Sequence, residues 1–589
     1  MTLCLRFLAA LSVLCVFTAP SFAETPDQQL TELMNESWQA TLDAQPILAS
    51  YLGESNNKDR LGRLDEQSHR DTANRLGRTL NALEEVDYQG LSEHNKVNYD
   101  VFRWMVQHER RQLDFNGRFL TFNTVVGWQT LFAQIAASTT FTTEQDYRDY
   151  TARLGDFGRY ADENIELMRK GIETGYVQPC ETLDGYEANI SGFISANADT
   201  SLFFGPFRAI PDKYHDNVRS DLEERGRHAI ETVVIPAYER YLKFYQNEYL
   251  PACRSDVGLS SIPGGQEYYE FLVDYFTTID TDANTVHELG LAEVRRIEQE
   301  MESLIEKIGF DGDTAAFAEF LRSNPDFYTE DSDDFMRRIA AIAKKADGLL
   351  PQFFAYIPRS QYSLIQVPAA IAPKTPAAFY QPGAADLTRA GLFFVNVHDV
   401  GKRPLYELTA LTAHEAVPGH HLQISVAQEL TDLPKFRQQY YFYAYGEGWG
   451  LYAEQLALEM GLYETDYDRY GQLIFEMWRA CRLVVDTGIH SKNWSRKRAI
   501  EFMIKHTALS AEAITTEVDR YITLPGQALA YKVGERELLR LRGRAEERLG
   551  SAFSLRDFHA LILTTGAVPL DVLAEVVEKW IDEKLDVPD

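Results

Sequence analysis

The segment from His414 to His421 constrains the fold most, because it places a helix break between two groups of potential metal ligands. An apolar run with helical spacing, residues 406–413, leads into the sequence His-Glu-Ala-Val-Pro-Gly-His-His. In a straight helix, His420 would be rotated by roughly 600° from His414, and His421 would lie about 10.5 Å along the axis. Proline removes a backbone donor and glycine accepts unusual dihedral angles, so Pro418-Gly419 predicts a kink that returns a late histidine towards His414.

Side chains that commonly bind metal ions are concentrated around this break. Within residues 414–454, three imidazoles and two of the carboxylates are candidate ligands or ligand supports: His414, His420, His421, Glu447 and Glu454. Glu415 adds a spare carboxylate beside the first imidazole, as zinc hydrolases require. A lone His-Glu pair is usually structural, but so many ligand types around one helix break indicate a metal site. A di-iron site needs Glu-x-x-His pairs and is excluded, because Pro418 stands at that offset from Glu415.

The N-terminus predicts export. Residues 1–23 combine Arg6, an apolar stretch from Phe7 to Phe17 and a small residue, Ala23, at the expected cleavage point. The apolar stretch is too short to span a bilayer, so we expect a soluble, periplasmic protein without stable membrane insertion. A lipoprotein is the alternative because Cys15 lies in the signal, although the preceding Leu14 is larger than lipoprotein cleavage sites usually allow.

Charge and cysteine content narrow the possible partners. The formal net charge of -30 disfavours nucleic acid and anionic lipid as partners. The mature chain keeps three cysteines in an oxidising compartment. Cys180 and Cys253 both follow proline-containing segments typical of loops, so a Cys180–Cys253 disulfide is plausible, with Cys481 left buried and free.

The hydrophobic periodicity is mostly helical. It predicts helices over residues 142–170, 216–248, 283–308, 333–350, 405–430, 440–460, 466–486 and 535–547. Strand patterns are few, and the best are Ser363–Ala370 and Gly391–Val397. The Gly- and Pro-containing segment Arg254–Gln266 suggests a boundary between an N-terminal helical half, 24–265, and a half that carries the predicted metal site, 266–589. Two halves of one compact unit are as compatible with this pattern as two domains.

Four motifs together resemble a known family. They are His-Glu-Ala-Val-Pro-Gly-His-His-Leu-Gln at 414–423, Glu-Gly-Trp-Gly-Leu-Tyr-Ala-Glu at 447–454, Arg-Leu-Val-Val-Asp-Thr-Gly-Ile-His at 482–490 and Leu-Pro-Gly-Gln-Ala-Leu-Ala-Tyr at 524–531. The chain resembles, over nearly all of its mature length, the bacterial family catalogued as domain of unknown function 885. That family is similar to the helical zinc peptidases called gluzincins, which include carboxypeptidase Taq and thimet oligopeptidase. The resemblance implies a mainly α, zincin-like metallopeptidase with a deep cleft and a small β element.

The resemblance also implies a ligand set for Zn²⁺. Those peptidases carry His-Glu-x-x-His and a later Glu-x6-Glu element whose first glutamate is the third ligand. Matching Gly-His-His-Leu of this chain to their Gly-His-Ala-Leu puts His420 on the second ligand after His414, with two residues inserted. The insertion keeps His421 as an alternative to His420. Glu447 falls on the third ligand, and Glu454 on the distal carboxylate that would orient a ligand.

Catalytic roles follow from this ligand set. Two imidazoles and one carboxylate leave a position on zinc for a water molecule, whose pKa falls from ~16 towards ~7. Glu415 would accept the proton of that water and pass it to the leaving amine. An oxyanion also needs a hydrogen-bond donor. The resemblance suggests Tyr531, for which a core aromatic is an equally good interpretation, and His490 is a further candidate.

Several other polar residues could contact a substrate or a ligand. Arg479 and Arg482 could hold a substrate carboxylate, although ion pairs within their own helix would explain them equally well. The segment Gly391–Asn396 could be an edge strand that pairs with an extended peptide, with Asn396 in contact with it, or a plain structural strand. Asp486 is a second candidate to orient a metal ligand.

The sequence therefore predicts an exported zinc metallohydrolase, most simply a peptidase that acts on short peptides. The metal and the reaction class rest on the residues, whereas the peptide substrate rests on the resemblance. Two alternatives stay open: a zinc amidase that acts on modified or non-peptide amides, and a catalytically silent peptide-binding protein that keeps the metal for structure.

Overall fold

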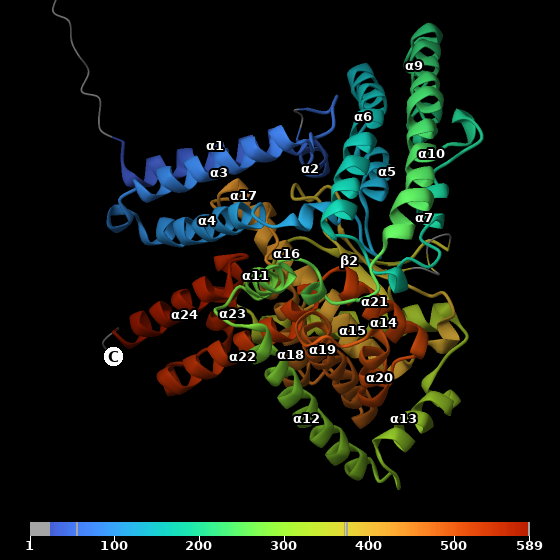
Figure 1. The fold of residues 1–589 in the computed structure, drawn as a ribbon. Helices are drawn as coiled ribbons and strands as arrows, with labels where there is room; N and C mark the ends of the chain where they lie inside the picture. The colour runs from blue at the N-terminus through green and yellow to red at the C-terminus, as the bar shows by residue number, and fades with distance from the viewer. Residues whose placement is uncertain (1–23, 55–56, 370–371, 373–374, 587–589) are drawn as a thin grey trace, which may run out of the picture.

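The computed structural model describes residues 24–586 except 55–56, 370–371 and 373–374, and these residues fold mainly into α-helices (Figure 1). The predicted signal peptide, residues 1–23, lies outside the described residues. One small three-stranded sheet is found in the described part of the chain. The prediction of a mainly α fold with a small β element is therefore confirmed.

Two groups of helices form the N-terminal region. The first contains long helices that lie side by side (Figure 1): α1 (Pro26–Ala44), α3 (Glu66–Glu84) and α4 (Glu93–Gln112). The second surrounds an aromatic-rich core: α6 (Glu144–Thr174), α9 (Asp216–Ala229) and α10 (Ile235–Phe244). Shorter helices join them: α2 (Pro46–Tyr51), α5 (Trp128–Ser138), α7 (Ala188–Ser191) and α8 (Gly205–Arg208).

Four long helices form the centre of the C-terminal region. They pack in two pairs: α12 (Ala283–Ile308) on α19 (Asp466–Lys492), and α18 (Tyr443–Glu459) on α22 (Ala530–Leu549). The second pair crosses with its backbones in contact. A Cβ atom on Gly534 would lie 1.9 Å from the carbonyl oxygen of Ala444, so only glycine permits this approach. Tight crossing holds α18 in place, and α18 carries two of the predicted site residues.

The remaining helices surround this centre. They are α11 (Gly265–Thr277), α13 (Thr314–Ser323), α14 (Ser332–Phe353), α15 (Leu408–Glu415), α16 (His420–Glu429), α17 (Lys435–Gln439), α20 (Arg496–His506), α21 (Ala511–Thr523), α23 (Leu555–Thr565) and α24 (Leu570–Leu585). None of the helices in the described residues combines the length and the apolar character needed to cross a membrane.

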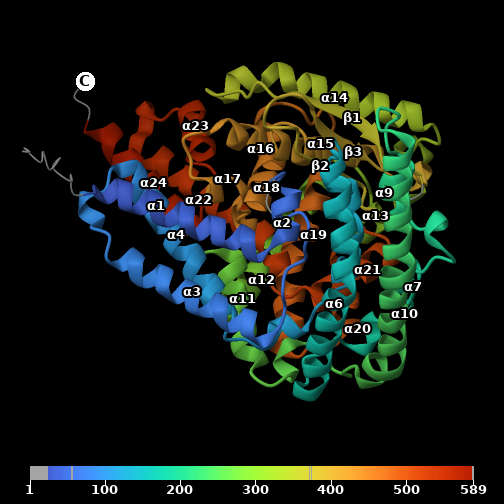
Figure 2. The same ribbon diagram turned by 90° about the horizontal axis from the view of Figure 1, so that it is seen from above.

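The sheet corrects one prediction. Its strands are β1 (Tyr362–Gln366), β2 (Ala378–Gln381) and β3 (Gly391–Val395), in the order β1-β3-β2, with β1 parallel and β2 antiparallel to β3. The predicted strand β3 is the middle strand, so the hypothesis that it is an edge is wrong. The edge strands are β1, which overlaps the predicted strand Ser363–Ala370, and β2, which the sequence did not predict. Helix α14 lies beside the sheet in Figure 2, and Phe335 and Ile339 pack on Phe393 and Val395.

Packing crosses the predicted boundary at residue 265. One hydrophobic cluster contains Met34 and Phe102 from the N-terminal region together with Trp449 and Leu541. The two predicted halves thus share a core in the described residues, and the division between them stays a prediction.

The predicted disulfide is confirmed. Cys180 and Cys253 are bonded, with their Cα atoms 5.1 Å apart. Cys481 is buried and free, also as predicted. The disulfide ties the segment after α6 to the segment after α10, where Pro179 and Arg254 also form a parallel bridge.

Candidate metal centre

The predicted helix break is present. Helix α15 ends at Glu415 and α16 begins at His420, with Ala416–Gly419 between them. A Cβ atom on Gly419 would lie 2.0 Å from the carbonyl oxygen of His414, so the two helix ends approach closely only because residue 419 is glycine. The break brings the start of α16 next to the end of α15.

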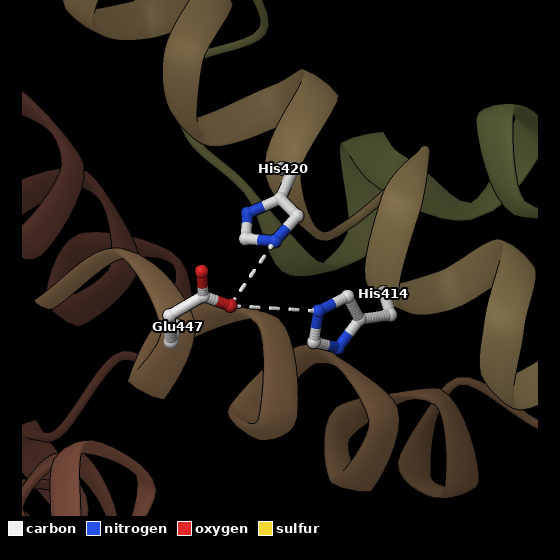
Figure 3. Close-up of side chains that lie close together, drawn as sticks. All are labelled: His414, His420 and Glu447. Atoms are coloured by element: carbon white, nitrogen blue, oxygen red, sulfur yellow. Dashed lines mark ion pairs between the residues drawn. The ribbon is translucent and has the colours of Figure 1, made fainter. Parts of the chain in front are cut away.

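Three side chains meet at this break in an arrangement suited to a metal ion. The ligand atoms of His414, His420 and Glu447 all lie within 4.8 Å of one another. The Oε2 atom of Glu447 is 3.6 Å from Nε2 of His420 and 3.9 Å from Nε2 of His414 (Figure 3). Ligands about 2 Å from a tetrahedral zinc ion are separated by about 3.3 Å. The observed separations are close to that value, so the donor set fits zinc.

The protonation states of the three side chains also bear on metal binding. Burial lowers the pKa of His414 to about 3, so its imidazole is neutral, the form that binds a metal. Burial opposes the charged form of His420, yet the nearby Glu447 raises the pKa of His420 to about 9. Burial likewise opposes the Glu447 carboxylate, but His420 and His414 together lower its pKa to about 2. The cation that this carboxylate attracts is the protonated imidazole of His420, and a metal ion would have to displace that proton.

Helix α18 supplies both Glu447, the predicted third ligand, and a residue that supports the cluster. Glu454 lies two turns after Glu447, and its Oε1 atom is 2.8 Å from Nδ1 of His414. This bond directs Nε2 of His414 towards Glu447, as carboxylates behind metal-bound histidines do. Between them, Gly450 leaves room for the ring, because a Cβ atom there would lie 2.6 Å from Cε1 of His414. The structure therefore places Glu454 where the sequence predicted it.

His421 is not part of this cluster. Its Nδ1 atom lies 2.9 Å from the hydroxyl of Tyr380 and 3.2 Å from that of Ser425. Its ring centroid is 4.5 Å from that of Tyr362. These contacts connect α16 to β1 and β2, so the structure brings His420, and not His421, to the other ligands.

A cavity of about 840 Å³ opens beside the cluster. Its lining includes His414, His420, Glu447 and also Glu415, the predicted proton acceptor. The opposite side comes from the N-terminal region, where residues 123–127 line the cavity. This volume is typical of sites for small ligands. The N-terminal segment is fixed to the C-terminal region by Thr124, whose hydroxyl lies 2.9 Å from that of Thr523.

Two tyrosines belong to the cavity lining. Tyr531, predicted from the resemblance, is present, and its ring centroid is 4.3 Å from Cζ of Arg482. The sequence did not predict a role for Tyr441, whose hydroxyl donates to Oε1 of Glu447 at 3.3 Å. The one sequence feature that relates to this contact is Gly446. A side chain at residue 446 would exclude Tyr441, because a Cβ atom there would lie 2.3 Å from the Tyr441 hydroxyl. Tyr441 engages one carboxylate oxygen and leaves the other facing the imidazoles.

Arg479 and Arg482 also line the cavity. Arg479 approaches Glu454 at 3.5 Å, and Arg482 donates to Glu517 at 3.1 Å. Neither forms the ion pairs within α19 that the alternative interpretation required. Glu476, the acidic neighbour on α19, pairs instead with Lys532 and with an arginine of α12.

His490 does not reach the candidate centre. Its Nδ1 atom accepts from the backbone N–H of Leu259 at 3.1 Å, and its Nε2 atom donates to the carbonyl of Tyr521 at 2.9 Å. It lies eight residues after Arg482 on α19, about 12 Å along the axis. Both ring nitrogens are used to join α19 to neighbouring segments, so the structure does not support the predicted oxyanion role.

Asn396 and Asp486 are likewise engaged elsewhere. The carboxamide of Asn396 donates to the carbonyls of Ala372 and Thr375 and is fully buried. Asp486 accepts from the hydroxyl of Tyr269 at 2.6 Å and from a backbone N–H at 3.0 Å. The structure therefore brings neither the predicted substrate contact nor this predicted ligand-orienting carboxylate to the cavity.

Comparisons with known proteins agree with this fold. A family model described as a bacterial protein of unknown function, DUF885, matches residues 46–577. A crystal structure from Colwellia psychrerythraea, described as a "putative lipoprotein", is 28% identical with a TM-score of 0.86, covering 95% of this chain and 100% of that one. A Shewanella oneidensis structure with the same description and unknown function is 17% identical with a TM-score of 0.74, covering 94% and 100%. No curated protein matches.

Proposed function

The chain belongs to DUF885, a family of bacterial proteins of unknown function. We propose that this protein is an exported zinc-dependent peptidase. The observation that carries the proposal is the cluster of His414, His420 and Glu447 at the wall of a cavity that Glu415 also lines. A purely structural zinc site is normally closed by four protein ligands. A three-ligand set beside a cavity and a free carboxylate favours catalysis.

The residues that would hold the ion are His414, His420 and Glu447, with Glu454 fixing the ring of His414. When bound, zinc supplies Lewis acidity, which makes a carbonyl carbon more open to attack and a water molecule easier to deprotonate. Glu415 accepts a proton at its carboxylate and returns it to the nitrogen of the leaving amine. The neutral imidazole of His414 is held ready for ligation by Glu454.

A hydrogen-bond donor is available for the carbonyl oxygen that gains charge during attack. Tyr531 lines the cavity, and burial raises its pKa, so its hydroxyl keeps the proton it would donate. Tyr441 is already engaged with Glu447 and acts by positioning that ligand. We therefore assign the donor role to Tyr531, as the similarity to gluzincins also suggests.

Strand β2 gives a reason to prefer a peptide as substrate. Residues 378–380 line the cavity, and β2 pairs with β3 on one side alone within the described sheet. An extended peptide can pair with such an edge through backbone hydrogen bonds. The role that the sequence analysis gave to β3 thus passes to β2. The cavity volume of about 840 Å³ favours short peptides over folded proteins.

Export is part of the proposal. The signal-like segment 1–23 predicts it, and the two solved relatives are both described as lipoproteins, a class of exported proteins. We propose a periplasmic location for the mature chain.

The decisive experiment combines metal analysis with a Glu415→Gln variant. We expect the purified chain to bind one zinc ion and to hydrolyse members of a short-peptide library, with activity lost to a chelator and restored by zinc. Glu415→Gln should retain zinc and lose about 10²–10⁴-fold in kcat, because the proton acceptor is gone. The matched control is Glu547→Gln on the exposed face of α22, which should keep full activity.

Three outcomes would contradict the proposal. Hydrolysis of modified or non-peptide amides alone would identify an amidase. Peptide binding without any turnover would identify a silent binding protein. Unchanged turnover by Glu415→Gln would remove Glu415 as the proton acceptor.

A further inference from the structure

One wall of the cavity carries a cluster of three arginines. Arg479, Arg482 and Arg520 line it, and the first two are only 6% and 4% exposed. In the described residues, two carboxylates lie within ion-pair distance of these three groups. Glu454 is 3.5 Å from Arg479, and Glu517 is shared by Arg482 at 3.1 Å and Arg520 at 2.9 Å. At ion-pair distance, three guanidinium groups thus face two carboxylates, while Glu447 and Glu407 act on Arg479 from further away.

Two of these arginines also have unused donors. Nε of Arg479 and Nη1 of Arg482 are buried without a hydrogen-bond acceptor in the described part of the chain. By contrast, Arg520 donates to Glu517 and to the carboxamide of Gln527. Trp478 holds the first two groups in place, with its ring centroid 4.7 Å from Cζ of Arg479 and 4.4 Å from that of Arg482. A planar anion with two oxygens carries the acceptors that these two guanidinium groups lack.

The wall is close to the candidate metal centre. The Glu454 oxygen that Arg479 approaches at 3.5 Å is the same atom that lies 2.8 Å from Nδ1 of His414. Consecutive Cα atoms of a peptide are about 3.8 Å apart. A carboxylate at the end of a peptide and bound at these arginines would therefore leave the last peptide bond, and not one further along, beside His414 and Glu415.

We infer that Arg479 and Arg482 bind the C-terminal carboxylate of a peptide, so that the protein removes residues from C-termini. This inference rests on the proposed peptidase function and adds the end at which the peptide is cleaved. The aromatic rings of Phe475, Trp478 and Tyr531 in the same lining favour an apolar last residue. The bond that breaks is the last peptide bond, and water supplies the hydroxyl of the new carboxylate and the proton of the released amine.

The test compares one short peptide with a free C-terminus to the same peptide as its C-terminal amide. We expect the acid to be cleaved at least about 100-fold more efficiently, with release of single residues. Arg482→Gln should reduce this preference by about tenfold or more, mainly through KM. The control Arg540→Gln, on an exposed arginine paired with Glu537, should leave the preference unchanged. An amidated peptide that ends in glutamate separates the terminal carboxylate from a side-chain carboxylate as the recognised group.

A binding measurement gives a second readout that does not need turnover. Calorimetry on the full chain, with and without zinc, should show a dipeptide acid binding at least about tenfold more tightly than its amide. Arg482→Gln should abolish the difference. Because that change removes one of the two arginines paired with the buried Glu517 and could destabilise the fold, Glu517→Gln is the second variant. It frees Arg482 from a competing carboxylate, so acid binding should become several-fold tighter.

The outcomes separate this inference from the proposed function. Equal cleavage of acid and amide at internal bonds would overturn the inference and leave the peptidase proposal standing. If neither the acid nor the amide were cleaved, the peptidase proposal would be contradicted. Calorimetry alone would then test whether Arg479 and Arg482 bind a terminal carboxylate. Equal binding of acid and amide, or weaker acid binding by Glu517→Gln, would overturn the assignment. Recognition of the amidated glutamate peptide as well as the acid would also overturn it.

Discussion

The cavity wall and the polar interior behind it contain the same kinds of side chain, but they differ in how far their hydrogen bonds are satisfied. On the wall, Nε of Arg479 and Nη1 of Arg482 have no hydrogen-bond partner in the described residues. Buried polar groups without partners are rare in folded proteins and costly to keep. We interpret these unpaired groups beside the cavity as hydrogen-bond donors available to a ligand.

Three polar residues in the interior behind the wall show the opposite pattern. His490 uses both ring nitrogens on backbone groups, Asp486 accepts from a tyrosine hydroxyl and a backbone N–H, and His421 lies within hydrogen-bond distance of two hydroxyls. These residues lie in or next to the motifs that suggested catalysis. Their saturated bonds indicate that they hold elements together, so the comparison separates binding residues from structural ones within the same motif.

The adjacent histidines His420 and His421 give the sharpest test of this comparison. His420→Ala should weaken zinc binding by more than about 100-fold while changing stability little, because a ligand is lost. His421→Ala should keep zinc but lose about 1–3 kcal/mol of unfolding free energy, because the hydroxyls of Tyr380 and Ser425 lose a shared partner. Competition titration with a chromophoric chelator and urea unfolding measure the two effects.

Each variant of this pair is the control for the other. Loss of zinc in His421→Ala, with zinc retained in His420→Ala, would reverse the ligand assignment and break the comparison.

His490→Ala tests the interior at the end of α19. We expect the free energy of unfolding to fall by about 2–4 kcal/mol, because a cavity opens and two buried backbone groups lose their partner. The kcat/KM of the fraction that remains folded should be unchanged, as measured at a temperature well below the midpoint of unfolding. Full stability combined with lost activity would instead restore the catalytic role that the sequence suggested.

The smallest expected effect is a pH dependence of folding stability that arises from Asp486. Burial raises its pKa from 3.8 to about 7 in the folded state. The folded protein therefore binds this proton more tightly than the unfolded chain. The contribution to stability is present below the unfolded pKa and is lost as pH rises through the folded pKa.

Asp486→Asn removes this titration. Between pH 5 and pH 8 the original chain should lose on the order of 2 kcal/mol relative to the variant, as measured by urea unfolding. Parallel stability curves for the two proteins would show that Asp486 does not titrate in this range.

The ligand cluster could be predicted from the sequence because its spacing is local. Pro418-Gly419 predicts the helix break. Glu447 and Glu454 are two turns apart on one helix, so both side chains lie on the same face of that helix. The long helices and the disulfide were predicted for similar reasons, since periodicity and loop composition can be read along the chain.

The incorrect predictions concern contacts between distant segments. The choice between an edge and a middle position for Gly391–Val395 depends on β2, whose four residues carry no clear strand pattern. His490 and Asn396 are polar residues near a motif, and sequence does not tell which way a side chain points. Tyr441 was missed because its role depends on space left by Gly446 one turn away.

The cavity is assembled from segments at opposite ends of the polypeptide. Residues 123–127 and Tyr531 both line it, and the hydroxyls of Thr124 and Thr523 meet although 399 residues separate them in the sequence. A nascent chain still leaving the ribosome therefore has no enclosed space beside its histidines. The cavity can form only after the last quarter of the chain has been synthesised, so the protein is inactive until then.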